Sequence, residues 1–152
     1  MQDGVEEALV MVPEINYWAV VVATVSTMVV GSLWYTPKVF GTRWMRLTGV
    51  DPDQEGASAV GPIAVTVVVS FVTAWVLAGA TYIAWTFYDG TFLVAALVTG
   101  VALWLGFTAA RFVTHDAFER RPVALTALNV AHELVTVLVM AVILGVWPPV
   151  GV

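Results

Sequence analysis

The hydrophobic positions of the chain gather into four long apolar stretches that are separated by short polar segments. A bilayer core of about 30 Å requires about 20 apolar residues in a helix, and each stretch reaches that length. A membrane barrel would show alternating polarity instead. The pattern predicts an all-α integral membrane four-helix bundle, a single membrane domain over residues 1–152. Its expected spans are 15–35, 62–85, 92–112 and 124–147.

A shorter amphipathic pattern follows the first span. After Pro37, the apolar residues Phe40, Trp44 and Leu47 recur at i, i+4 and i+7, and the bases lie largely elsewhere on the helical wheel. This spacing predicts an interfacial helix at about 37–48, with its apolar side toward the membrane and its bases toward anionic lipid. The residues expected at this membrane interface are Trp34, Tyr35, Phe40, Arg43, Trp44 and Arg46.

The composition supports a membrane protein and excludes several other classes. Apolar residues make up 60% of the chain and charged residues 11%, which excludes an ordinary water-soluble domain and a disordered chain. The six bases form two clusters without an extended track for phosphates, which argues against nucleic acid as a partner. The absence of cysteine removes disulfides, iron–sulfur clusters and thiol catalysis.

The placement of the bases predicts the orientation. All six lie in the first loop or in the region from 111 to 121, whereas the N-terminus, the turn at 86–91 and the C-terminus carry none. The positive-inside rule makes the basic side cytoplasmic, so both termini are expected outside. Tyrosines and tryptophans cluster near both expected boundaries, as membrane interfaces favour.

One polar stripe interrupts the fourth span. Asn129, His132, Glu133 and Thr136 fall at i, i+3, i+4 and i+7, which is a single helical face. Glu133 lies ~13 Å into the span at 1.5 Å per residue, so we expect it near the middle of the membrane. An acid there costs ~2.5–3.5 kcal/mol and is by default a candidate functional site. The stripe is expected to face protein or water.

Arg111 is the candidate partner of this stripe. It enters the third span from the cytoplasmic end, on a face that also carries Trp104, Thr108 and His115, and its long side chain can reach toward Glu133. Two alternatives stay open: Arg111 as an anchor that extends to the headgroups, and the other polar residues as hydrogen-bonding links between helices. The expected polar pocket comprises Glu133, His132, Asn129, Arg111 and Thr136.

The sequence offers little for catalysis or metal binding. His132 and Glu133 begin a His-Glu-x-x-His zinc motif, but position 136 is Thr, so the second ligand is missing. His115, Asp116 and Glu119 can hold a hard cation weakly but are more typical of a solvated helix end. We expect no metal site, no cofactor and no enzymatic activity.

The segment from Gly31 to Gly49, with its Gly-x-x-Trp-Tyr-x-Pro element, resembles the signature of domain-of-unknown-function family 1761, a family of small prokaryotic membrane proteins. The tripeptide that begins at Asn16 and the segment from Asn129 to Gly145 fit the same pattern. The resemblance implies four spans and brings no established activity. With the membrane topology, it favours a multi-pass protein of a prokaryotic cell membrane.

Three functions stay open. The favoured one is a non-enzymatic oligomeric membrane protein with a polar pocket around Glu133 and His132, whose partners are the lipid bilayer, further copies of the chain, and a proton or small molecule. The alternatives are a proton-coupled small-solute transporter or channel, and a structural or accessory scaffold without transport. A ladder of small residues on the third span fits internal packing or an oligomer seam: Ala95, Thr99, Ala102, Gly106 and Ala110.

Overall fold

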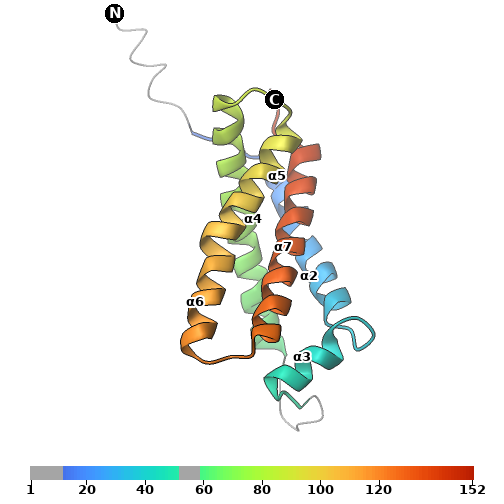
Figure 1. Ribbon diagram of the computed structural model, residues 1–152. Helices are drawn as coiled ribbons and strands as arrows, with labels where there is room; N and C mark the ends of the chain where they lie inside the picture. Colours follow the sequence, from blue (N-terminus) through green and yellow to red (C-terminus); the bar gives the residue numbers. More distant parts are fainter. Residues whose placement is uncertain (1–11, 52–58) are drawn as a thin grey trace, which may run out of the picture.

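The computed structural model describes residues 12–51 and 59–152, and this part of the chain folds into helices joined by turns (Figure 1). α5, η2 and α6 run on as one helical segment, so four segments are long and apolar enough to cross a membrane. The all-α four-helix bundle and the membrane character are therefore as predicted. The helices are α2 (Tyr17–Trp34), α3 (Gly41–Thr48), α4 (Val60–Phe87), α5 (Phe92–Leu103), the π-helical η2 (Trp104–Ala109), α6 (Ala110–Phe118) and α7 (Val123–Val146).

The third span is longer than predicted. The sequence pattern placed its end at residue 112, after the first charged residue, but the helix continues to Phe118. A single charge does not stop a helix whose backbone hydrogen bonds can continue. The end comes where Arg120 adopts a positive φ of 56° and Pro122 follows. Arg111 and Asp116 therefore lie on a helix.

The core is built mainly from small side chains that let the helices approach closely, as is usual in membranes. α7 contacts both α5 and α2, and α4 packs against α2 and α5. Gly145 of α7 touches α5, because a Cβ there would lie 2.8 Å from the Cα of Leu93 and 3.3 Å from the Cβ of Ala96. The buried core residues include Ala19, Ala23, Ala74, Leu77, Ala96, Met140, Ala141 and Leu144.

The small-residue ladder of the third span does not serve this internal packing along its length. Ala102, Gly106 and Ala110 are exposed, and a Cβ on Gly106 would meet nothing within 4 Å. The close contact with α7 is made by Ala96 and Gly100 instead. Each of these follows a ladder residue directly in the sequence, so they lie on a neighbouring face of the helix. The outer part of the ladder therefore faces away from the bundle.

Hydrogen bonds join the helices at the C-terminal end of α7 and in the middle of the bundle. At the C-terminal end of α7, the Nδ2 of Asn16 donates to the backbone oxygens of Trp147 and Pro148 at 3.3 and 3.4 Å. In the middle, the hydroxyl of Thr27 donates to that of Ser70 at 3.0 Å. The antiparallel arrangement of α2 and α7 follows from the first contact, because it joins the start of one helix to the end of the other.

All the bases of the chain lie toward one end of the bundle. The six Lys and Arg residues are carried by the turn before α3, by α3 itself, by α6 and by the turn after α6. Figure 1 shows α3 and the end of α6 at the opposite end from the C-terminus. We refer to this end as the α3 end.

The close contact at Gly145 is testable by adding one methyl group. We expect Gly145→Ala to destabilise the protein by about 1–3 kcal/mol, because the new Cβ must displace the backbone of α5. Thermal unfolding of the detergent-solubilised chain measures the effect. Gly79→Ala in α4 is the matched control, since its Cβ would make only ordinary van der Waals contact, 3.8 Å from the Cδ1 of Ile15. Equal unfolding temperatures for the two variants would contradict this account of the core.

Candidate functional site

The turn that follows α2 is held tightly by its backbone. The amide of Phe40 donates to the oxygen of Trp34 at 3.1 Å, and that of Gly41 donates to the oxygen of Thr36 at 2.9 Å. A Cβ on Gly41 would collide with the backbone of Tyr35 and Thr36, so only glycine fits there without a shift. α3 begins at Gly41 because the four residues before it form this turn, and not at 37 as the spacing predicted.

His132 of α7 packs into this turn. Its ring centroid lies 5.0 Å from that of Tyr35 and 5.7 Å from that of Trp34, the latter edge-to-face. A Cβ on Gly31 would lie 3.8 Å from the Nε2 of His132, so the imidazole sits directly against the last turn of α2. The Gly-x-x-Trp-Tyr element at residues 31–35 therefore forms the surface against which His132 packs.

Two further aromatic rings complete the surroundings. Phe40 lies 4.5 Å from Trp34 between ring centroids, and Trp44 of α3 lies 5.4 Å from Tyr35. We call Trp34, Tyr35, Phe40 and Trp44 the aromatic turn. It links α2 to α3 and brings α3 against α7.

Glu133 stands beside His132 but points into more open space. Its Oε1 lies 3.4 Å from the Nδ1 of His132, and its side chain is 38% exposed against 14% for the histidine. Two features of the site affect the pKa of Tyr35, which follows the last residue of α2: the burial of its side chain and the nearby Glu133. Burial raises the pKa of Tyr35 to about 12, and the negative charge of Glu133 acts in the same direction.

The pair lies level with the end of α2 along the bundle. His132 contacts the last turn of α2 and the turn after it, so the pair lies near the end of the first span and not at its middle. The reason is a difference in length. α7 has 24 residues, about 36 Å, whereas α2 has 18, about 27 Å. The first turns of α7 therefore extend past α2 toward the α3 end.

The other residues of the expected pocket are placed differently. Asn129 is half-buried and Thr136 is buried, and within residues 12–51 and 59–152 neither makes a side-chain hydrogen bond to another helix. Arg111 is exposed and forms no ion pair with Glu133. The structure thus joins His132 and Glu133 to the aromatic turn and leaves Arg111 apart.

The π-helical segment explains why Arg111 lies elsewhere. A π-helical turn inserts one extra residue, which rotates the following helix by about 100°. Before the rotation, Trp104 faces α7 and donates from its Nε1 to the oxygen of Val130 at 3.1 Å. After it, Arg111 and His115 are both exposed. The expectation that Trp104, Arg111 and His115 share one face assumed a regular helix, and it is wrong for this reason.

The apolar side of α3 is also placed differently from the prediction. We expected Phe40, Trp44 and Leu47 to enter the lipid, but Phe40 lies at a tilt against Trp34 and Trp44 lies edge-to-face against Tyr35. An aromatic pair contributes about 0.5–1.5 kcal/mol beyond the area that it buries, and the short turn at Gly41 holds α3 against the bundle. The expected interface residues Arg43 and Arg46 do lie exposed on the outer side of α3.

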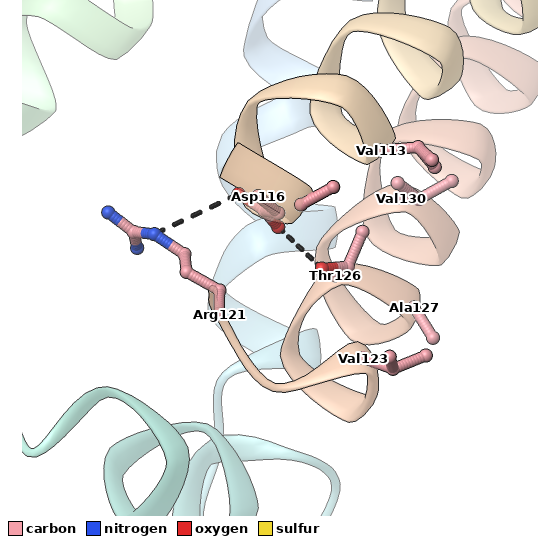
Figure 2. Close-up of a pocket in the computed structure, with 8 residues that line it drawn as sticks. Val113, Asp116, Arg121, Val123, Thr126, Ala127 and Val130 are labelled. Carbon is pink, nitrogen blue, oxygen red and sulfur yellow. Dashed lines mark hydrogen bonds and ion pairs between the residues drawn. The ribbon is translucent and has the colours of Figure 1, made fainter. Parts of the chain in front are cut away.

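A second polar cluster joins α6 to α7 (Figure 2). Asp116 is buried, with 8% of its surface exposed, and accepts a hydrogen bond of 2.6 Å from the hydroxyl of Thr126. The Nε of Arg121 lies 3.8 Å from the other carboxylate oxygen of Asp116 and 2.6 Å from Glu119. The hydrogen bond with Glu119, above all, raises the pKa of the exposed Arg121 guanidinium. The cluster therefore fastens the hairpin between the third and fourth spans.

This cluster was missed because the sequence pattern assigned Asp116 to a solvated helix end. The signal that could have found it is the turn at Pro122, which folds α7 back along α6 and brings Thr126 beside Asp116. A groove of about 280 Å³ adjoins the cluster, and its lining is mostly apolar, with Val113, Val123 and Val130 among its residues. Among the described residues, no three His, Asp or Glu side chains are grouped to hold a metal ion.

Comparison with known proteins identifies one family. The family described as "Protein of unknown function (DUF1761)" matches residues 18–145, which cover the aromatic turn, His132, Glu133 and the Asp116 cluster. No curated protein and no solved structure matches the chain.

The link between Asp116 and Thr126 gives a stability prediction. Thr126→Val removes the hydroxyl while keeping the shape of the side chain, so the buried carboxylate loses a charge-assisted hydrogen bond. We expect a loss of about 1–3 kcal/mol in the free energy of unfolding. Denaturation in detergent measures it, with Thr114→Val as the control, because that hydroxyl is exposed and only bonds to its own helix. No difference between the two variants would show that the cluster does not fasten the hairpin.

Proposed function

We propose that the chain, which belongs to the DUF1761 family, is a non-enzymatic oligomeric membrane protein that takes up a proton or a small cation at His132 and Glu133. The observation that carries this proposal is the contact between the buried imidazole, the partly open carboxylate and the aromatic turn. Aromatic faces attract cations, and a carboxylate adds a full negative charge. Such a place favours a bound ligand of positive charge.

The way these two residues are bonded favours a function beyond holding helices together. Polar residues that link membrane helices do so by hydrogen bonds from one helix to another. Thr27, Trp104 and Asp116 make such bonds. In the described part of the chain, neither nitrogen of His132 bonds to another helix, and its closest polar contact is Glu133 on its own helix. Placing an ionisable pair in a membrane span costs free energy, and this pair returns none of it by linking helices. This imbalance favours a function for the pair other than stabilising the bundle.

The surface of the third span supports the oligomer. Ala102, Gly106 and Ala110 are exposed there, and small residues on a lipid-facing surface let a second helix approach closely. The interior of a single chain is filled by side chains such as Leu77 and Met140, which are almost completely buried. A pathway for a solute would therefore need the boundary between copies.

Proton-coupled passage of a small solute is the second candidate, and the unequal exposure of the pair favours it. Glu133 is reachable from outside the bundle, whereas His132 is enclosed. A proton that arrives at the carboxylate can then be held by the imidazole beside it. This arrangement suits an exchange of protons more than a purely structural scaffold.

Reconstitution in liposomes tests the proposal. We expect the parent protein to dissipate an imposed proton gradient, read by an enclosed pH-sensitive dye, and Glu133→Gln to lower that rate at least tenfold, because the amide cannot carry the proton. Glu14→Gln is the matched control, since Glu14 is an exposed acid at the opposite end of the bundle. We expect it to retain the parent rate.

The same preparations test the oligomer. The chain has a mass of 16.3 kDa, and we expect the detergent-solubilised particle to contain at least two copies in the parent and in both variants. A monomer would contradict the oligomer. An oligomer that leaves proton gradients intact in the parent and in Glu133→Gln alike would contradict proton exchange and favour the scaffold.

A further inference from the structure

We propose that the exposed bases at α3 bind the phosphate headgroups of anionic lipid: Arg43 and Arg46 on the outer side of the helix, with Lys38 in the turn before it. We call these three residues the basic face. This binding is independent of any proton at His132, because it uses the opposite side of α3 from the aromatic turn. It is a surface for a defined partner, the charged leaflet of the membrane, and it does not depend on the proposed function above.

The two sides of α3 have different roles. Gly41, Trp44 and Thr48 recur at i, i+3 and i+7 and are buried or half-buried against the bundle. Thr42, Arg43 and Arg46 occupy the opposite side and are exposed. Since Arg43 and Arg46 are three residues apart, their guanidinium groups extend from the same side of the helix.

The helix is held in place without the help of lipid. Trp44 packs on Tyr35, and α3 contacts α7. Its end is set by Gly49, which has a positive φ of 72° and donates its amide to the oxygen of Met45 at 2.9 Å. Figure 1 shows α3 running across the direction of α2 and α7 at the end of the bundle. The basic face is therefore a fixed platform at the end of a membrane span.

The positive charges of the basic face are exposed and can interact with groups outside the protein. Within the described ranges, Lys38, Arg43 and Arg46 are exposed and form no ion pair with a carboxylate. The turn before α3 follows directly on Trp34, the last residue of a membrane span, so the three cations stand at the depth of the headgroups. A guanidinium group binds phosphate oxygens through two parallel hydrogen bonds, which suits a phospholipid.

Because one side of α3 packs against protein, the helix can respond to the charge of the lipids but not to their packing or curvature. A helix that inserts its apolar side senses the packing and curvature of lipids as well as their charge. In this chain Trp44 and Phe40 are already in contact with protein. The basic face therefore selects lipids by charge, and its binding falls as salt screens that charge.

A lipid titration of the purified full chain in neutral detergent tests this. Phosphatidylglycerol and phosphatidylcholine of equal chain length are added separately, and native mass spectrometry counts the lipids retained per chain. We expect phosphatidylglycerol to bind at least tenfold more tightly. Arg43→Gln with Arg46→Gln is expected to weaken it roughly 30-fold, about fivefold for each arginine near a charged surface. Raising the salt is expected to weaken binding to the parent.

Matched variants keep the result interpretable. Arg120→Gln removes one charge at the same end from an exposed position outside α3, and we expect less than a twofold loss, against about fivefold for Arg43→Gln alone. Arg43→Lys with Arg46→Lys preserves charge and is expected to stay within fivefold of the parent. An unchanged melting temperature shows that each variant is folded.

Three results would overturn the proposal. These are equal binding of the two lipids, equal losses in Arg43→Gln and Arg120→Gln, and displacement of the lipid by inorganic phosphate at the same concentration. The third outcome would assign the basic face to a free anion, and the first to apolar contacts alone.

Discussion

The α3 end of the molecule depends on one constraint, which is that the imidazole of His132 has to be sheltered from lipid where α7 passes the end of α2. The ring lies against Gly31 in the last turn of α2, and Trp34 and Tyr35 cover it. The tight turn at Gly41 then brings α3 back toward the bundle, so that Trp44 lies against Tyr35. The position of α3, and with it the placement of the exposed arginines, follows from how this one polar ring is enclosed.

Two groups of polar residues in the bundle differ in what they bond. The first group connects helices, as the Thr27–Ser70 and Asp116–Thr126 pairs do, and their hydrogen bonds replace those that water would supply in a soluble protein. The second group is the His132–Glu133 pair, whose 3.4 Å contact lies within one helix. The first group holds the helices of the bundle together. The second group is the one suited to binding a proton or an ion.

The spans could be predicted from the sequence because the length of a membrane helix is imposed by the bilayer, and their ends agree with the structure within two residues except after Arg111. The shared face of His132 and Glu133 was also predictable, since α7 is a regular helix. The position of Arg111 was not, because hydrophobicity does not reveal the extra residue of a π-helical turn. The packing of Trp44 on Tyr35 and the burial of Asp116 depend on turns whose geometry is set by contacts distant in sequence.

The most direct test of the central claim is the accessibility of position 133, and a chain without cysteine makes it simple. Glu133→Cys in sealed liposomes is exposed to a water-soluble, membrane-impermeant maleimide, with Thr42→Cys and Asp89→Cys marking the two ends of the bundle. The account predicts that Cys at 133 is labelled from the same side as Cys at 42 and protected from the side that labels position 89. Labelling only by a maleimide dissolved in the lipid would show a carboxyl that faces acyl chains, and would contradict the account.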